Sequence, residues 1–236
     1  MHAEKKPASQ VASISVIIPA LNEAMEIAET IRRALVIPEV CQIIVVDGGS
    51  NDATRDIAVA HGCTVLECEP SRGKQLCLGA AQARGDVVLL LHADTWLPLE
   101  AGRAALDCLC DERVVTGGFY KCFRDPHWLM RGSRFRCWLR WALFQRVLGD
   151  QAMFIRRDAL ERIGGVPDVP LMEEYELLKK LRPLGRIALA NATVTTSSRR
   201  FRERGVLRTY WRMASVTARY FLGAPPEGLR RTYEKE

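Results

Sequence analysis

The first hundred residues alternate apolar, strand-like segments with segments of helical periodicity. The strand-like segments are 13–18, 41–46, 63–68 and 86–91, and the helical segments between them are 22–35, 51–62 and 74–85. Strands that alternate with helices pair in parallel, and each becomes a nearly continuous apolar run because helices cover both faces of the sheet. The sequence therefore predicts an α/β fold with a mostly parallel sheet and helices on both faces.

Each of these four strands is followed by a polar or glycine-rich segment. The four segments are, in order, PALNE, DGGSND, EPSRGK and HADT. Loops are generally polar, so chance could supply one or two such segments. The carboxyl ends of parallel strands meet at one edge of the sheet, where ligands bind in open α/β sheets. Four polar segments in succession therefore predict a ligand site at this edge.

The first three segments each have a structural and a ligand-binding interpretation. Asn22 and Glu23 could cap the following helix, with Asn22 as the N-cap. Asp47 could form a turn with the glycines that follow, or its carboxylate could accept hydrogen bonds from a base or ribose. Residues 72–74 could form a solvated turn, or Arg72 and Lys74 could approach a diphosphate at a helix start. None of the three is decisive alone.

The fourth segment, HADT, predicts a metal site. A carboxylate there suits a divalent cation, Mg²⁺ or Mn²⁺, which prefers oxygen ligands and often shares them with substrate phosphates. Asp94 is therefore the predicted metal ligand. His92 could be a second ligand, a packed residue or a hydrogen-bond donor to phosphate, and we favour the donor. The two side chains should point the same way if the strand continues to Asp94, because residues two apart on a strand share a face.

Composition favours an anionic partner and an intracellular setting. The 236-residue chain has a net charge of +6, which suits phosphates, nucleic acid or an acidic membrane surface. No apolar run reaches the roughly 18–20 residues that span a bilayer, and no secretory apolar region precedes a cleavage site. The 8 cysteines form no C-x-x-C pair, so we expect reduced thiols and a cytoplasmic protein. Residues 1–12 are interpreted as a flexible tail.

Residues 127–149 are basic and aromatic and include no acidic residue. This stretch could be an amphipathic helix whose apolar side packs on the domain, or it could make peripheral contact with an anionic membrane, and the two can coexist. Basic residues among aromatic ones also suit nucleic acid, but no nucleic-acid motif accompanies them, so no nucleic-acid partner is expected. Most arginines of the segment 197–231 are interpreted as a solvated helix face.

An ordered set of motifs resembles the nucleotide-sugar half of family 2 glycosyltransferases, which have the GT-A fold: VIIPALNE, VVDGGSNDAT, RGKQLCLGA and GDVVLLLHADT. The resemblance continues in GGFY, GDQAMFIRR and GGVPDVPLMEEYELLKKL, and TSSRRFRERGV is similar to the bacterial subgroup called radical-SAM/selenodomain-associated transferase family 2. The resemblance implies one GT-A-like, Rossmann-like domain. Residues 13–100 would bind the nucleotide-sugar, and residues 101–236 would bind the acceptor and supply the catalytic base.

The resemblance also implies roles for residues of the donor site. Asp47 would contact the nucleoside base, and Asp94 matches the last acid of the Asp-x-Asp motif that holds the metal and the diphosphate. Arg199 and Arg200 follow a predicted strand and are candidates for a mobile loop that closes on the diphosphate. The full predicted donor set is Pro19, Ala20, Leu21, Glu23, Asp47, Ser50, Gly73, Lys74, His92, Ala93, Arg199 and Arg200.

The acceptor half carries the implied general base, Glu174. Acids in the first turn of a helix near Leu171 are favoured by the helix dipole alone, but sugar transfer also needs a carboxylate within reach of the acceptor hydroxyl. The sequence departs from the family twice: His92 replaces the first Asp of Asp-x-Asp, and Glu174 replaces the usual Asp base. The predicted acceptor-binding residues are Gly118, Asp150, Gln151 and Glu173.

The sequence thus predicts a metal-assisted, inverting glycosyltransferase that moves a sugar from a nucleoside-diphosphate sugar to an acceptor hydroxyl. Membrane contact through 127–149 would be consistent with a lipid or lipid-linked acceptor, whose identity the sequence does not give. Two alternatives stay open: a nucleotidyltransferase, which can use a related sheet and a metal-binding acid, and a non-catalytic module that binds a nucleotide-sugar or a membrane, since fold alone does not fix function.

Overall fold

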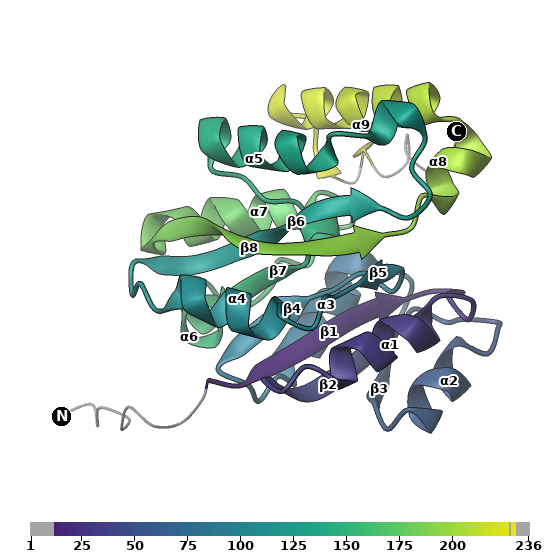
Figure 1. The fold of residues 1–236 in the computed structure, drawn as a ribbon, viewed down its shortest axis with the longest axis vertical. Coiled ribbons are helices and arrows are strands. Elements are labelled where there is room, and N and C mark those ends of the chain that lie inside the picture. The colour runs from purple at the N-terminus through teal and green to yellow at the C-terminus, as the bar shows by residue number, and fades with distance from the viewer. Residues whose placement is uncertain (1–11, 227, 230–236) are drawn as a thin grey trace.

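The computed structural model describes residues 12–226, 228 and 229, so only Ala12 of the predicted tail lies within the described part of the chain. The strands form one eight-stranded sheet in the order β3-β2-β1-β4-β7-β6-β8-β5 (Figure 1). The strands are β1 (Ile14–Ala20), β2 (Val40–Asp47), β3 (Thr64–Glu67), β4 (Val87–Leu90), β5 (Thr95–Trp96), β6 (Val114–Phe123), β7 (Met153–Arg156) and β8 (Arg186–Thr196).

The four strands of the N-terminal half are parallel neighbours, as the alternating pattern predicts. β1 lies between β2 and β4, and β3 pairs with β2. The second half joins the same sheet through β7, which pairs antiparallel with β4 and sets Val88 opposite Ile155. β6 and β8 pair in parallel, while β7 with β6 and β5 with β8 are antiparallel. One continuous sheet therefore carries both the predicted donor half and the predicted acceptor half.

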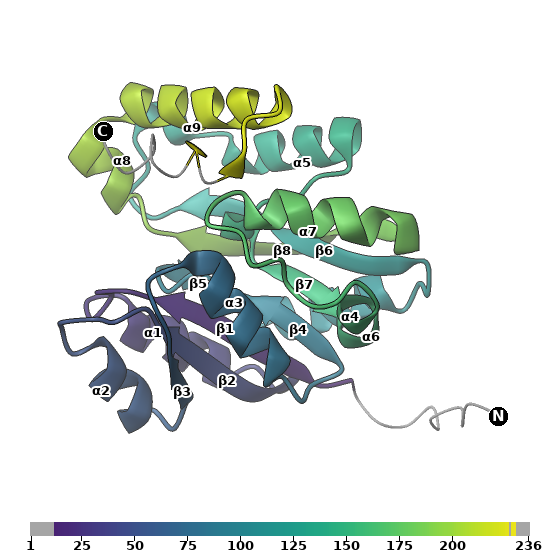
Figure 2. The ribbon, with the colours of Figure 1, turned by 180° about the vertical axis from the view of Figure 1, so that it is seen from behind.

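Helices cover both faces of the sheet. They are α1 (Ile27–Leu35), α2 (Thr54–Ala60), α3 (Arg72–Ala81), α4 (Ala101–Leu109), α5 (Ser133–Phe144), α6 (Arg157–Arg162), α7 (Glu173–Leu181), α8 (Arg199–Arg204) and α9 (Val206–Phe221). α1 and α4 lie in front of the sheet in Figure 1. α3 and α7 cover the opposite face, which Figure 2 shows. Three short 3₁₀ turns, Trp128–Met130, Gly149–Gln151 and Arg182–Leu184, connect the elements of the second half.

The two largest parts of the core lie one on each face of the sheet. Leu89 packs with Ile31 of α1 and Ala105 of α4, whereas the adjacent Val88 packs with Leu76 of α3 and Leu177 of α7. Successive residues of a strand point to opposite faces, and both faces here are buried. This arrangement explains why β4 is apolar at every position and fully buried.

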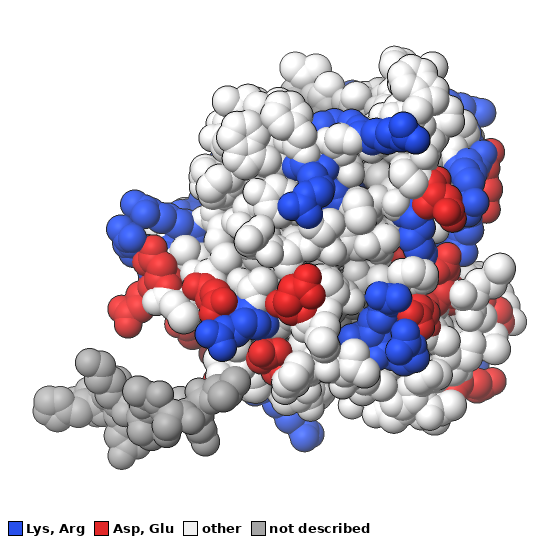
Figure 3. All heavy atoms as spheres, in the orientation of Figure 1, with Lys and Arg blue, Asp and Glu red and all other residues white. Residues whose placement is uncertain are grey.

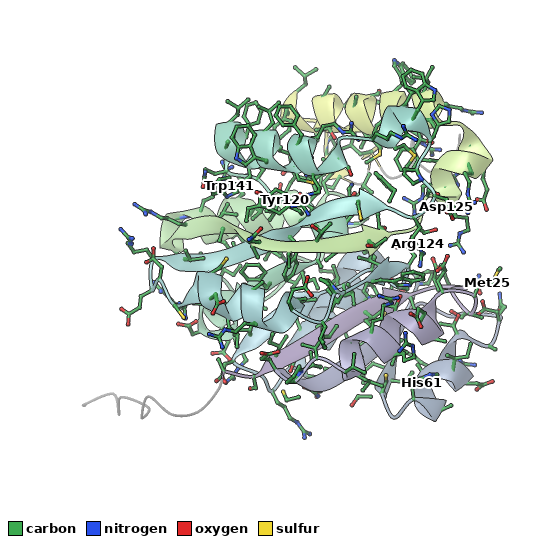
Figure 4. All side chains as sticks on the ribbon, in the orientation of Figure 1. Met25, His61, Tyr120, Arg124, Asp125 and Trp141 are labelled. Atoms are coloured by element: carbon green, nitrogen blue, oxygen red, sulfur yellow. The ribbon has the colours of Figure 1, made fainter. Side chains whose placement is uncertain are left out.

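α5 and α9 form a further layer over β6 and β8, on the side away from the N-terminal half (Figures 1 and 2). The ring nitrogen of Trp141 donates a hydrogen bond of 2.8 Å to the Ile187 carbonyl of β8. Trp141 and Tyr120 lie between α5 and the sheet in Figure 4. The stretch 127–149 is not one continuous helix, because Gly132 has a φ of 76° between the 3₁₀ turn and α5.

The 8 cysteines all lie within the described residues and are free thiols. Among residues 12–226, 228 and 229, no helix has the length and apolar character needed to cross a membrane.

Candidate active site

The loops that follow β1 and β2 are joined to each other by hydrogen bonds. The Asn22 amide donates to the Ser50 hydroxyl at 2.9 Å, and the Asn51 amide donates back to the Asn22 side chain at 2.9 Å. The Glu23 amide donates to the Thr54 hydroxyl, also at 2.9 Å. The interpretation of Asn22 as the N-cap of the next helix is therefore wrong, because α1 begins only at Ile27. A φ of 55° at Asn22 accommodates this loop.

Asp47, the predicted base-reading acid, is fully buried at the end of β2. One carboxylate oxygen accepts the amides of Gly49 and Ser50 at 2.9 and 2.8 Å, and the other accepts the Ser50 hydroxyl. These bonds fix the shape of the loop after β2. The turn-forming interpretation of Asp47 is therefore realised in the structure, and its contact with a base stays a prediction.

Gly73 and Lys74 lie in the first turn of α3 and not in a loop. A side chain at Gly73 would come within 2.8 Å of the Val169 nitrogen and closer still to the Val169 carbonyl, so only glycine fits there. Lys74 points to the surface, where it pairs with Glu69 at 3.0 Å. The next residue, Gln75, is buried and donates to the carbonyls of Ala20 and Val46 at 2.9 and 2.7 Å. α3 is thereby tied to the ends of β1 and β2.

The chain turns directly after β4, so His92 and Asp94 do not share the face of a strand. β4 ends at Leu90, and the Thr95 amide closes a turn by donating to the His92 carbonyl at 3.1 Å. The condition for a shared face, a strand that continues to Asp94, is not met because this turn intervenes. Ala93, within the turn, is buried, and its carbonyl accepts the Thr30 hydroxyl at 2.7 Å.

Asp94 is half-buried and held by neighbours from three elements. One carboxylate oxygen lies 3.2 Å from the Thr95 hydroxyl and 3.5 Å from the Thr196 hydroxyl at the end of β8. Its carbonyl accepts a bond of 3.1 Å from Arg124, which also pairs with Glu26 at 2.8 Å. Arg124 lies at the end of β6 in Figure 4, facing the end of β1. Arg124 was not identified from sequence, because it lies outside every motif.

Arg199 connects the far end of the chain to the loop after β1. Its guanidinium lies 2.9 Å from Glu23. Burial raises the pKa of Glu23, Arg199 opposes this effect, and the nearby charge of Asp94 adds to it. The segment is helix α8 rather than the predicted loop, because residues 199–204 complete a short helix after β8. Arg199 thus lies where two predicted donor residues, Glu23 and Asp94, come together.

His92, Arg72, Glu173 and Glu174 converge on Gly149. A Cβ at Gly149 would lie 2.8 Å from a Glu174 oxygen, 2.9 Å from an Arg72 nitrogen and 3.1 Å from the His92 ring nitrogen. Arg72 contacts Nε2 of His92 and pairs with the buried Glu173. The Gly149 amide donates to Glu174 at 3.2 Å. The structure therefore brings together residues from α3, the loop after β4, the segment before β7 and the start of α7.

The protonation of this cluster follows from burial and charge. Burial and the positive charge of Arg72 hold the pKa of His92 well below its ordinary value, so the ring is neutral. An arginine can only donate, so Nε2 is the acceptor and is not available to donate to a phosphate. Burial and the neighbouring Glu174 raise the pKa of Glu173 to about 7, although Arg72 opposes the shift. Glu174 is only half-buried, and so it is the more accessible of the two carboxylates.

The remaining predicted acceptor residues divide into one charged pair and two packing positions. Asp150 pairs with Lys121 of β6. Although burial acts in the opposite direction, Lys121 holds the pKa of Asp150 below its ordinary value. Gln151 is fully buried and bonds to Arg140 and to the Phe119 carbonyl.

A Cβ at Gly118 would lie 3.1 Å from Val147, so this glycine allows close packing. Lys121 and Arg140 were not identified from sequence, because only the fold places them beside the 149–151 segment.

The donor groups around Asp94 fit a cation shared with a ligand. In the described part of the chain, no cluster of three or more His, Cys, Asp or Glu side chains could hold a metal by itself. Mg²⁺ usually keeps several waters and binds through one or two carboxylates plus substrate phosphates. A single oriented carboxylate, Asp94, meets that requirement only together with a phosphate ligand.

The family model for glycosyl transferase family 2 matches residues 15–164, which is more than half of the chain. The chain belongs to glycosyl transferase family 2. The match covers the loops after β1, β2 and β4 and the 149–151 segment, whereas Glu173, Glu174 and Arg199 lie beyond the matched residues.

Two curated relatives illustrate the range of the family. The probable glycosyltransferase YdaM of Bacillus subtilis is 27% identical over 89% of this chain and 55% of its own length. Glucosyl-3-phosphoglycerate synthase of Mycolicibacterium paratuberculosis is 36% identical over 39% of this chain and 31% of its own length. The chain thus spans about half or less of these relatives.

Solved structures with the same fold include glucosyl-3-phosphoglycerate synthase of Mycobacterium tuberculosis, in complex with Mg²⁺ and UDP. It is 22% identical to this chain with a TM-score of 0.59, and the match covers 80% of this chain and 75% of the solved chain. S. aureus TarS is 18% identical to this chain with a TM-score of 0.62, and the match covers 79% of this chain and 60% of the solved chain. The predicted GT-A-like α/β fold is confirmed. The radical-SAM/selenodomain-associated subgroup stays a prediction.

Proposed function

We propose that the protein transfers a sugar from a nucleoside-diphosphate sugar to an acceptor hydroxyl, with inversion and with the assistance of a divalent cation. The observation that carries this proposal is the arrangement around Arg72. Its guanidinium bonds to His92 and Glu173 and also experiences the negative charges of Glu174 and Asp94. A candidate metal carboxylate and a candidate base carboxylate thus both lie close enough to one cationic centre to interact with its charge.

The donor would lie at the carboxyl edge of β1, β2 and β4. Its nucleoside would contact the joined loops that contain Leu21 and Ser50, and its diphosphate would lie beside Asp94, with the cations of α8 nearby. Arg199 is held at this edge by Glu23. Arg200 lies close enough to His92 for its charge to help lower the pKa of that ring.

Asp94 would hold the cation together with the donor diphosphate, and the cation would neutralise charge on the departing diphosphate as a Lewis acid. The other steps belong to the side chains of the chain itself. Asp94 keeps its orientation through Thr95 and Thr196, and Arg124 fixes its backbone. The Asp94 carboxylate is therefore already oriented before the donor binds.

Glu174 would be the general base. Its carboxylate accepts the Gly149 amide, which orients the oxygen that makes this bond. Proton removal by a positioned carboxylate typically accelerates such a step by about 10²–10⁴-fold. An attack from the side opposite to the leaving diphosphate inverts the anomeric carbon. Glu173, predicted from sequence to bind the acceptor, is buried and pairs with Arg72, so its proposed role is to position Arg72.

Thermal unfolding in the presence of nucleotides tests this proposal. UDP is tried first because it is the nucleotide in the solved complex of glucosyl-3-phosphoglycerate synthase, followed by GDP, CDP and dTDP, each with and without Mn²⁺. A ligand at about one hundred times its Kd adds about 2.7 kcal/mol of stability, which is a clear shift in Tm.

We expect Mn²⁺-dependent stabilisation by one nucleotide, lost in Asp94→Ala and kept in the control Asp107→Ala on the exposed face of α4. No shift with any nucleotide would overturn the donor site. A shift without turnover that survives Glu174→Gln would favour the non-catalytic module instead.

A further inference from the structure

Helix α5 turns an apolar stripe outward. Its buried residues, Ser133 and Cys137, face the sheet. Its last residue, Phe144, is exposed. Four other large exposed side chains follow a spacing of three and four residues, which places them along one face of the helix. They are Phe135, Trp138, Leu139 and Leu143, with exposed fractions of 61%, 43%, 37% and 64%. An amphipathic helix normally buries such a stripe against its own domain, and α5 does not.

Helix α9 shows the same feature. Leu207 and Trp211 lie one turn apart and are 71% and 70% exposed, while Phe221 and Leu222 at its end are 50% and 87% exposed. The two helices lie side by side, since Arg136 of α5 bonds to the Tyr210 hydroxyl of α9 at 3.3 Å. Of the 17 large exposed apolar side chains among the described residues, the majority lie on α5, α9 and their flanking residues. We call this surface the α5–α9 face.

The charged residues of the two helices that form the α5–α9 face are all positive. Neither 127–149 nor the helix Val206–Phe221 contains an acidic residue. The surface over α5 in Figure 3 is white and blue, with the red side chains lying elsewhere. The arginines within the two helices are Arg134, Arg136, Arg140, Arg208, Arg212 and Arg219.

A groove opens between the two helices. Its volume is about 340 Å³, and it lies next to the start of α7. Apolar side chains and three arginines line it together, and the guanidinium of Arg146 lies 4.4 Å from the centre of the Phe221 ring. The apolar lining residues include Leu139, Leu143, Phe144 and Phe221, and the basic ones are Arg136, Arg140 and Arg146.

We infer that the α5–α9 face binds the surface of an anionic lipid bilayer. Apolar and aromatic side chains enter the boundary between headgroups and acyl chains, and arginines pair with anionic headgroups. A second copy of the chain is disfavoured, because two identical cationic faces would repel each other. Nucleic acid would pair with the arginines but would leave the exposed leucines in water. The inference does not depend on the proposed transferase activity.

Vesicle flotation tests the inference. The full chain is mixed with vesicles of phosphatidylcholine alone or of phosphatidylcholine with phosphatidylglycerol, at low salt and at about 0.5 M salt, where the Debye length is only a few ångströms. The face variant is Trp138→Glu, Leu143→Glu and Trp211→Glu combined. The matched control is Leu35→Glu, Val59→Glu and Leu99→Glu combined, since these residues are comparably exposed on other elements.

We expect the wild type and the control to float with the phosphatidylglycerol vesicles, and salt to weaken this binding. The face variant should bind these vesicles at least about tenfold more weakly while keeping the Tm and the nucleotide response of the control. Absence of wild-type flotation, or equal binding by both variants, would overturn the inference. The inference would also be overturned if the protein did not bind vesicles and instead used this face to self-associate or to bind nucleic acid.

Discussion

Glu174 is the residue on which the proposed chemistry depends most. Glu174→Gln keeps the size of the side chain and its hydrogen bond with Gly149 but removes the base, so we expect turnover to fall about 10²–10⁴-fold. Donor affinity should be unchanged. Steady-state release of nucleoside diphosphate measures the first quantity, and titration calorimetry measures the second. Glu112→Gln, on an exposed residue outside the predicted site, is the control; a loss of turnover below about tenfold in Glu174→Gln would remove Glu174 from this role.

Glu173 should make the stability of the protein depend on pH. Its pKa is raised to about 7 from 4.5, so between these values the folded state binds more protons than the unfolded state. The free energy of unfolding therefore falls as pH rises through this window, by an amount on the order of 1–3 kcal/mol. Glu173→Gln should flatten this part of the curve. Urea unfolding of both proteins from pH 4.5 to 7.5 checks this, and parallel curves would contradict the assignment.

For single residues, the sequence indicated which ones are candidates for the site, but it did not indicate which contacts their side chains make. Asp94, Glu174 and Asp47 are recognisable from the motifs around them. Two features depend on hydrogen bonds formed only in the fold: both carboxylate oxygens of Asp47 accept bonds from its own loop, and a turn separates His92 from Asp94. Arg124 could not be found at all from sequence, because its partners Glu26 and Asp94 are distant in the chain.

At the scale of elements, the packing of α3 against the segment before α7 depends on Gly73. Alanine in a helix is normally about 1 kcal/mol more favourable than glycine. At Gly73, however, the added Cβ would overlap the Val169 backbone, so Gly73→Ala should destabilise the protein by about 1–3 kcal/mol.

Chemical denaturation measures this difference. Lys74→Ala, the adjacent and exposed position, should change stability by less than about 1 kcal/mol. An increase in stability for Gly73→Ala would show that the two segments are not in contact.

Helix α8 should contribute to donor binding. Arg199→Ala and Arg200→Ala each remove a cation beside the expected diphosphate, so the Kd for the nucleotide should rise about tenfold or more. The exposed Arg202 lies on the same helix and provides the control Arg202→Ala. Nucleotide titration in the presence of Mn²⁺ is the measurement. An unchanged Kd in both variants would confine the role of Arg199 to its pair with Glu23.

The sequence predicted the strands of the first half well, because strands buried on both faces are apolar without interruption. Helix starts were less predictable. α1 begins only at Ile27, since the residues before it bond to the loop after β2. In the second half, the exposed apolar stripes of α5 and α9 resemble ordinary amphipathic helices in sequence. Only the structure shows which side of each helix is buried.

At the scale of the whole molecule, the pairing of β4 with β7 creates the site. β4 leads into His92 and Asp94, and β7 follows Gly149 and Asp150, so the antiparallel pairing brings these segments to the same edge of the sheet. The motif order predicts that the two halves form one domain. It does not predict the strand order, because antiparallel pairing between distant segments leaves no local signal.

The measurement that tests the central claim most directly is proton NMR of the sugar released from a nucleotide-sugar, with water as the surrogate acceptor. UDP-glucose and Mn²⁺ are tried first, followed by donors with the nucleotide that stabilises the protein most, and early time points precede mutarotation. We predict nucleoside diphosphate together with a sugar of inverted anomeric configuration, and neither product from Asp94→Ala. A retained configuration, or no release from any donor with any acceptor supplied, would contradict the account.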